Sequence, residues 1–125
     1  MTEHTVVEVC DVMTGDLIAV RPVDRAGRAL DVLLQSGLHA LPILDEDSNP
    51  VGLVTLADLV PIDRQLPVGE RFCGPPLTID HRAPIAAAAS LMRQEYVHHL
   101  IVTDGKTAVG MLSSYDLLKV LEDES

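Results

Sequence analysis

The sequence predicts an α/β (α+β) fold made of two β-α-β-β-α repeats that pack against each other with pseudo-two-fold symmetry. Two observations lead to this prediction. The chain has 125 residues, 47% hydrophobic but only 2% aromatic, so its core has to be aliphatic. The chain also repeats itself, and neither copy alone is long enough for a secure core.

The repeat is visible when the sequence is shifted along itself. A shift of 59 residues places residues 16–20 on residues 75–79. One residue is then lost in a turn, and a shift of 58 places residues 51–55 on residues 109–113. Loops tolerate single-residue changes of this kind. The chain therefore consists of two copies of one unit, each somewhat shorter than half of the 125 residues.

Each copy is expected to begin with a short strand followed by a helix. Apolar runs with β propensity at 17–20 and 77–79 predict the strands. In the first copy, Asp24 is placed to cap the helix and Gly37 to end it, since glycine accepts a left-handed conformation. In the second copy, Pro84 fits the first helical turn.

A hairpin and a final helix complete each copy. In the first copy, residues 40–44 and 51–55 predict two strands around an acidic turn. In the second copy, the shorter turn 104–106 has the composition of a tight hairpin. The final helices are expected to start near Ala57 and Tyr115.

These elements predict a domain organisation. Residues 9–60 form the first repeat, residues 61–67 a proline-bounded linker and residues 68–121 the second repeat. A linker this short and stiff keeps the repeats close together. Packing through their sheets is expected to create two equivalent clefts between the repeats.

The charge balance argues against several classes of partner. Nine Lys and Arg against nineteen Asp and Glu give a net charge of -10. Nucleic acids and anionic membranes are disfavoured, because both are bound through clustered cationic residues. No apolar run is long enough to span a bilayer, and the N-terminus does not resemble a secretory signal. A cytoplasmic protein is predicted.

Sequence motifs for catalysis and for metal binding are not found. Cys10 and Cys73 form neither a CxxC motif nor a metal-spaced set, so two free thiols are expected, with a disulfide as the alternative. There is no P-loop, G-x-S-x-G or H-E-x-x-H motif, and no base lies beside Cys73 in the sequence. No catalytic residue, no metal site and no enzymatic activity are predicted.

The strand-to-helix junction is the candidate site. Residues 52–58 and 110–116 share the form G-h-h-[T/S]-x-x-D, in which h is hydrophobic. One interpretation is helix capping by Thr55 and Ser113. The other adds a ligand, because a carboxylate can accept two hydrogen bonds from a diol such as ribose, and a helix N-terminus favours phosphate. The two roles are compatible.

At this junction the sequence resembles the cystathionine-β-synthase (CBS) domain pair, or Bateman module. The resemblance rests on Asp11-Val12-Met13-Thr14, on residues 39–45 and on both junction segments, and it extends from about Val9 to Val120. It implies a stand-alone regulatory module, with catalysis left to separate domains. It also implies that AMP, ADP, ATP or a related adenosyl compound binds in the clefts between the repeats, with no obligatory cofactor.

The resemblance further implies roles for individual residues. Asp58 and Asp116 would hold the ribose hydroxyls, with Thr55 and Ser113 supporting the ribose or phosphate. The other candidate ligand-binding residues lie at the adenine edge, just before the second strand of each repeat, or beside the second acid; they are Ile18, Ala19, Leu77, Thr78, His39, His98, His99 and Tyr115.

Several alternatives stay open at this point. The three histidines could be surface residues with no ligand, and a zinc site at His98 and His99 lacks further ligands. Tyr115 could stack on a ligand or fill the cleft. The basic residues are scattered along the sequence, which favours AMP or an uncharged nucleoside over ATP. The cleft containing Asp116 is preferred, because two histidines lie in its repeat.

Assembly is the last expectation from the sequence. The helices at 26–34 and 117–121 carry apolar positions that a thin module leaves unburied, and such patches mark interfaces. A homodimer is therefore expected, together with a regulated protein partner. The rival function is a ligand-free structural or dimerisation module that scaffolds another protein.

Overall fold

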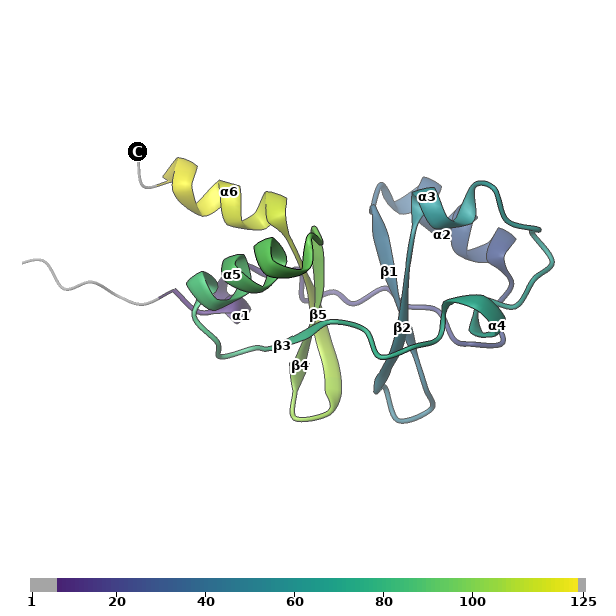
Figure 1. The fold of residues 1–125 in the computed structure, drawn as a ribbon, viewed down its shortest axis with the longest axis horizontal. Coiled ribbons are helices and arrows are strands. Elements are labelled where there is room, and N and C mark those ends of the chain that lie inside the picture. Colours follow the sequence, from purple (N-terminus) through teal and green to yellow (C-terminus); the bar gives the residue numbers. More distant parts are fainter. Residues whose placement is uncertain (1–6, 124–125) are drawn as a thin grey trace, which may run out of the picture. The chain divides into compact units, whose positions relative to one another are not determined.

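The computed structural model describes residues 7–123, which form two compact units (Figure 1). The first-hairpin unit consists of residues 18–76 and 106–108. The second-hairpin unit consists of residues 7–17, 77–105 and 109–123. Each unit contains a β-hairpin and the helices that cover it.

Helices and strands are mixed along the described part of the chain. The helices are α1 (Val9–Val12), α2 (Ala26–Ser36), α3 (Leu56–Leu59), α4 (Gly69–Phe72), α5 (Ile85–Glu95) and α6 (Ser114–Asp123). The strands are β1 (Ala40–Leu44), β2 (Pro50–Thr55), β3 (Thr78–Asp80), β4 (His99–Asp104) and β5 (Thr107–Ser113). None of these helices is both long enough and apolar enough to cross a membrane.

The strands form two small sheets, and the predicted α+β fold class is confirmed. In the first-hairpin unit, β1 and β2 pair antiparallel, with Ala40 opposite Thr55. In the second, the order is β3-β4-β5, and β3 runs parallel to β4 with Thr78 beside Ile101. Gly105, with φ 63°, supplies the left-handed residue of the predicted tight turn.

The strand predicted at 17–20 is reduced to one residue. Val20 alone pairs with β1 in a parallel bridge: its N–H donates to Pro42 O at 3.0 Å, and its carbonyl accepts from Leu44 N at 2.9 Å. Residues 17–19 form no bridge, and Ile18 and Ala19 are exposed, so most of this apolar run is not part of a sheet. The counterpart prediction at 77–79 is confirmed in part, as β3.

Two helix ends differ from expectation and one agrees. Asp24 does not cap α2: its Oδ2 accepts from Arg21 N at 2.7 Å, and the N-cap residue is Arg25, which makes no side-chain cap bond. Pro84 is the N-cap of α5 rather than part of its first turn. Gly37 ends α2 with φ 74°, as predicted.

Each short helix belongs to the hairpin unit of the other sequence repeat: α1 precedes the first hairpin in the sequence, and α4 precedes the second. Residues 7–17, which include α1, belong to the second-hairpin unit, where Thr14 and Met111 exchange two backbone hydrogen bonds of 2.9 and 3.1 Å. In the first-hairpin unit, Gly74, just beyond α4, donates to Val51 O at 2.9 Å. Each hairpin edge is therefore extended by the segment that follows a short helix.

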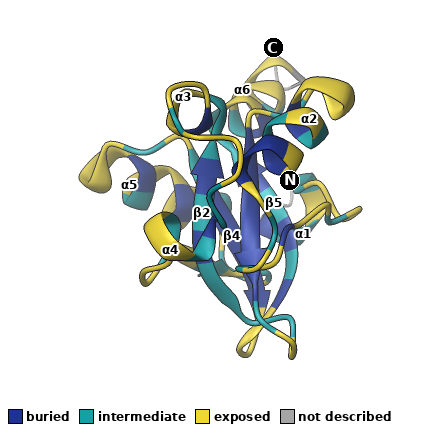
Figure 2. Cartoon of the chain, turned by 90° about the vertical axis from the view of Figure 1, so that its right-hand side faces the viewer, coloured by how far each residue is buried: buried dark blue, intermediate teal, exposed yellow. Residues whose placement is uncertain are grey.

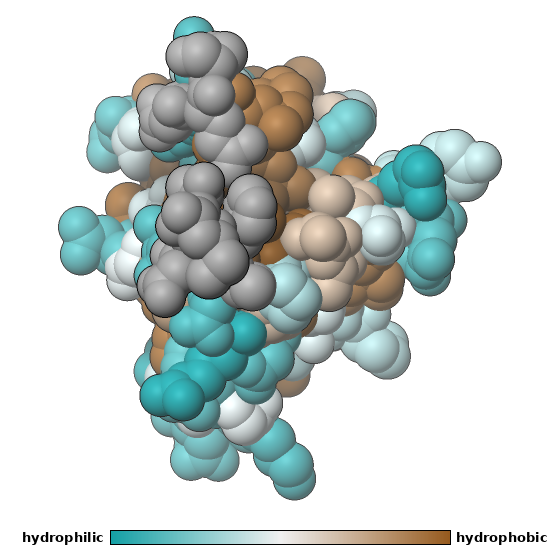
Figure 3. All heavy atoms as spheres, turned by 90° about the vertical axis from the view of Figure 1, so that its left-hand side faces the viewer, coloured by the Kyte–Doolittle hydropathy of each residue, from teal (hydrophilic) through white to brown (hydrophobic). Residues whose placement is uncertain are grey.

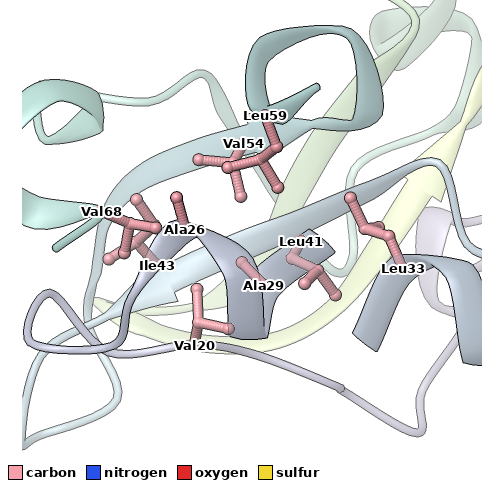
Figure 4. Packing of buried hydrophobic residues seen from close by; sticks show 9 residues of the cluster. All are labelled: Val20, Ala26, Ala29, Leu33, Leu41, Ile43, Val54, Leu59 and Val68. Atoms are coloured by element: carbon pink, nitrogen blue, oxygen red, sulfur yellow. The ribbon is translucent and has the colours of Figure 1, made fainter. Parts of the chain in front are cut away.

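The core of each unit is aliphatic, as the composition predicted. Figure 2 shows that buried residues concentrate along the strands, with exposed residues on the outer helices and loops. The first-hairpin core, drawn in Figure 4, consists of Val20, Ala26, Ala29, Leu33, Leu41, Ile43, Val54, Leu59 and Val68. The second-hairpin core consists of Val9, Ala88, Met92, Leu100, Val102 and Leu112.

Gly52 of β2 gives the first testable prediction. A Cβ at this position would overlap the carbonyl oxygen of Phe72 and lie 3.0 Å from Ile43 Cδ1. Gly52→Ala is expected to lower the free energy of unfolding by about 1–3 kcal/mol, the usual cost of overpacking. Urea denaturation measures this. The control is Gly74→Ala, because a Cβ at Gly74 meets nothing within 4 Å; equal losses in both variants would contradict the prediction.

Candidate ligand-binding site

The first junction is a closed capping box where β2 runs into α3. Thr55 N donates to Asp58 Oδ2 at 2.9 Å, and Asp58 N donates to Thr55 Oγ1 at 3.2 Å. Leu56 N donates to the carbonyl of His39, at 3.3 Å. The strand end, the helix start and the residue before β1 therefore meet at one point.

The second junction has the same hydrogen bonds where β5 runs into α6. Ser113 N donates to Asp116 Oδ2 at 2.8 Å, and Asp116 N donates to Ser113 Oγ at 3.2 Å. Ser114 N donates to the carbonyl of His98, at 2.9 Å. The capping interpretation is confirmed at both junctions, and both final helices begin one residue earlier than expected.

The carboxylates of Asp58 and Asp116 differ in the contacts that their Oδ1 atoms make. Asp58 is exposed, and its Oδ1 has no hydrogen-bond partner among residues 7–123. Asp116 is only 8% exposed, and its Oδ1 lies 3.4 Å from Lys119 Nζ. One carboxylate is thus open to a donor from solvent, whereas the other already faces a cation.

Lys119 is a candidate site residue that the sequence interpretation missed. Its ammonium lies 3.4 Å from the Asp116 carboxylate and 5.5 Å from the centroid of the Tyr115 ring. The i,i+3 spacing from Asp116 was the available signal, since residues three apart on a helix are neighbours. The corresponding position of the first repeat is Pro61, so the cation occurs at the second junction alone of the two.

The predicted histidines lie at the junctions of their own units. His39 and His98 are exposed, and each accepts a backbone hydrogen bond from the start of a final helix. The Nδ1 atom of His98 also lies 3.5 Å from Ser114 Oγ. His99 is half-buried at the start of β4. The structure therefore brings the His98 ring to the hydroxyl of Ser114, at the start of α6.

The predicted adenine-contacting backbone is partly open. Ile18 and Ala19 are exposed, and their backbone groups make no backbone hydrogen bond with other described residues. The carbonyl of Leu77 accepts from Ile101 N at 3.2 Å, and Thr78 begins β3. Tyr115 is 67% exposed, so its ring faces largely into solvent.

Only one cluster of metal-binding residue types occurs in the part of the chain that the structure describes. Ligand atoms of Glu8, Cys10 and Asp11 lie within 4.8 Å of one another. Glu8 and Asp11 form the capping box of α1, in which Glu8 N donates to Asp11 Oδ2 at 2.9 Å. Helix capping therefore accounts for their proximity. Cys10 and Cys73 are both free thiols.

Comparison with protein families identifies the chain. The model of the CBS domain matches residues 9–63 and again residues 70–123. The chain belongs to the CBS domain family. This confirms the resemblance inferred from the junction motifs and shows that the chain contains a CBS pair.

Relatives with curated sequences cover the chain to different extents. A CBS domain-containing protein of Dictyostelium discoideum is 34% identical over 113 residues, 74% of this chain and 78% of that protein. Protein YtoI of Bacillus subtilis is 28% identical over 98% of this chain, and MJ1404 of Methanocaldococcus jannaschii 26% identical over 93%. The chain spans only 28% and 32% of the lengths of these two relatives.

An enzyme is also among the relatives. Inosine-5'-monophosphate dehydrogenase of Methanocaldococcus jannaschii is 28% identical over 87% of this chain, but the match covers 22% of the enzyme.

Solved CBS pairs share the fold. The CBS pair of protein MJ0100, in complex with 5'-methylthioadenosine and S-adenosyl-L-methionine, matches with a TM-score of 0.89 and 20% identity, over 97% of this chain and all of that one. CBSX2 in complex with AMP matches with a TM-score of 0.85 and 24% identity, over 94% of this chain and 98% of its own.

The capping boxes give a prediction about stability. Thr55→Ala removes the oxygen that accepts from Asp58 N, and loss of such a cap costs about 1 kcal/mol. A drop of this size in the free energy of unfolding is expected by urea denaturation. Thr55→Ser keeps the acceptor oxygen and should restore most of the loss. If the serine variant were as unstable as the alanine variant, the hydroxyl would not be the stabilising group.

Proposed function

We propose that this chain is a regulatory module that binds an adenosine-containing ligand at its strand-to-helix junctions and passes the bound state to a partner protein. The observation that carries the proposal is the duplicated junction: both repeats place an aspartate at the start of a helix in the same capping box. The bound compounds of the MJ0100 pair and of CBSX2 support the choice of an adenosyl ligand.

The carboxylates suit a ribose because capping occupies only part of each. Oδ2 of Asp58 takes the Thr55 N–H, which leaves Oδ1 for a ligand hydroxyl. A carboxylate oxygen has two lone-pair sites, so Oδ2 can accept a second bond as well. One side chain can thus hold the helix start and bind a vicinal diol.

The second junction is the better candidate for a ligand with a phosphate. Lys119 Nζ, 53% exposed as a side chain, lies at the Asp116 carboxylate, and His98 contacts Ser114 there. We assign the ribose hydroxyls to Asp116 and the phosphate to Lys119 and His98. A single ammonium group suits the low charge of AMP better than that of ATP.

The remaining assignments complete the proposal. Exposed backbone at Ile18 and Ala19 in one unit, and the Leu77–Thr78 segment in the other, would meet the adenine edge. Residues 9–60 and 68–121 are proposed as the two functional repeats, joined by the linker 61–67.

Ligand binding would act as a switch and not as a step of catalysis. A ligand shifts an equilibrium between two states only by its differential affinity for them. The partner protein would then recognise the stabilised state. The rival function, a ligand-free scaffold, predicts no saturable binding of any adenosyl compound.

Replacing the two acids separates these possibilities. Asp58→Ala and Asp116→Ala each remove hydrogen bonds to a charged acceptor, worth roughly 1.5–3 kcal/mol apiece. Affinity for AMP at that junction should fall by about tenfold or more. Calorimetric titration with AMP, ADP, ATP, NAD and S-adenosylmethionine measures this, with melting curves recorded beside it. Asp47→Ala is the control, because this exposed acid lies in the β1–β2 turn.

The outcomes of this titration are distinct. Unchanged affinity in both variants would contradict the ribose assignment. A loss confined to Asp58→Ala would move the ligand to the first junction. Stability loss with no binding by the parent chain would favour the ligand-free scaffold.

A homodimer is the proposed assembly. Leu34 on α2 and Leu118 and Leu121 on α6 are 59–64% exposed. Figure 3 shows hydrophobic side chains at the surface on the side of the second-hairpin unit. Exposed apolar patches of this kind mark interfaces.

Light scattering at tens of micromolar protein measures the mass. The unmodified chain should have twice the monomer mass of 13.5 kDa, and Leu118→Glu with Leu121→Glu should be monomeric. Arg82→Glu, in the exposed turn between β3 and α5 and not on α6, should stay dimeric. A monomeric unmodified chain would rule the homodimer out.

A further inference from the structure

A cavity with several arginines in its lining lies within the first-hairpin unit. It has a volume of about 420 Å³ and lies between α2 and the connector at residues 64–65. Its polar lining consists of Arg25, Arg28, Asp31, Gln35, Arg64 and Gln65. Neither capping box contributes a residue to it.

Folding concentrates positive charge at this cavity. Three of the nine Lys and Arg residues of a chain with net charge -10 line it, against one acid, Asp31. The expectation that the basic residues are scattered is therefore wrong for Arg25, Arg28 and Arg64. No sequence pattern indicated this cluster, because Arg64 lies 36 residues beyond Arg28 and reaches α2 only in the folded unit.

The arginines are held in different ways. Arg64 Nη2 lies 3.2 and 3.0 Å from the two carboxylate oxygens of Asp31. Arg25 Nη1 donates to the carbonyl of Gln65. Arg28 is exposed and has no ion pair or side-chain hydrogen bond among residues 7–123. Since a guanidinium carries five N–H donors, most donors at this cavity remain available.

Gly27 fixes the position of the Arg64 side chain. A Cβ on Gly27 would lie 3.0 Å from both Cβ and Nε of Arg64, so this side chain crosses α2 where the helix has no side chain of its own. The Gly27 N–H donates to Arg64 O at 2.9 Å, and the Ala26 N–H to Leu66 O at 2.8 Å. The first helical N–H groups are thus already bonded, and an incoming anion would meet side chains.

We propose that this cavity binds a small organic anion that carries a phosphate group. Guanidinium forks match phosphate oxygens with two parallel hydrogen bonds. The volume lies within the range of about 300–1,000 Å³ that is usual for small-molecule pockets. The amide of Gln35 and the side chain of Val32 are available to the organic part of the ligand.

The site is separate from the duplicated junctions. At the equivalent positions of the second repeat, Arg25, Arg28 and Asp31 are replaced by Pro84, Ala87 and Ser90. The cavity therefore belongs to the first repeat alone, and it goes beyond the adenosyl function proposed above.

The test is a nuclear magnetic resonance titration of the ¹⁵N-labelled chain at constant ionic strength, with inorganic phosphate and with glycerol 3-phosphate. Both probes should cause saturable shifts of the Arg28 Nε–H and the Gln35 side-chain amide, with the ester binding more tightly. Arg28→Gln should weaken binding at least tenfold without a change in melting temperature, because Arg28 makes no side-chain hydrogen bond or ion pair with the described residues. Arg93→Gln, the same charge change on exposed α5, should bind like the unmodified chain.

Three results would overturn the proposal. Shifts that fail to saturate, or whose largest values lie away from Arg28 and Gln35, would exclude a site in this cavity. Equal weakening of phosphate binding in Arg28→Gln and Arg93→Gln would show that binding depends on the overall charge of the chain and not on this cavity. Saturable phosphate shifts that centre on His98, Ser114 and Lys119 would place the anion at the second junction. The cavity proposal is read from phosphate binding by Arg28→Gln, and the adenosyl proposal from AMP binding by Asp58→Ala and Asp116→Ala, so failure of one is distinguishable from failure of the other.

Discussion

Close backbone packing at two glycines is the constraint on which the rest of the structure depends. Gly52 and Gly110 lie in the hairpin strands that end at the two junctions, and a Cβ at Gly110 would lie 2.6 Å from Met13 Sδ and 2.7 Å from Thr14 O. The hairpin edges can pair with the segments beyond α1 and α4 because these positions carry no side chain. This pairing fixes strands β2 and β5, and therefore the place where each final helix begins.

The capping box then determines what each aspartate can do. A carboxylate bonded through Oδ2 to the N–H three residues earlier is held in one orientation, so its Oδ1 is directed before any ligand arrives. Such preorganisation lowers the entropic cost of binding. At Asp116 the oxygen that a ligand hydroxyl would use is already occupied, because Lys119 Nζ lies 3.4 Å from Oδ1. A ligand there has to displace the ammonium group or give it a phosphate to bind.

Local sequence patterns predicted most helices, hairpins and turns, but they missed features that depend on residues far apart in the sequence. The hairpins, the left-handed Gly37 and the junction caps Thr55 and Ser113 could be predicted, because each depends on neighbours within a few positions. Asp24 was wrongly placed as a cap, because its carboxylate accepts from Arg21 N instead. The strand at 17–20 was overestimated because Val20 alone pairs with β1, and Ile18 and Ala19 are exposed. The sequence did not predict that residues 9–17 belong to the second-hairpin unit, nor that arginines line a cavity. Both features depend on contacts between segments far apart in the sequence.

The two repeats have diverged in where they hold positive charge, and this bears on how the two proposed sites could influence each other. The second repeat has Lys119 at its junction, whereas the first has Pro61 there and its arginines around the cavity. In the first-hairpin unit, a short segment links the Asp58 junction to Arg64. Its course is fixed by the buried Leu59, whose carbonyl accepts from Ile62 N at 3.1 Å. Ligands at the two sites would be coupled only if both prefer the same arrangement of this segment, and the coupling would then be equal in both directions.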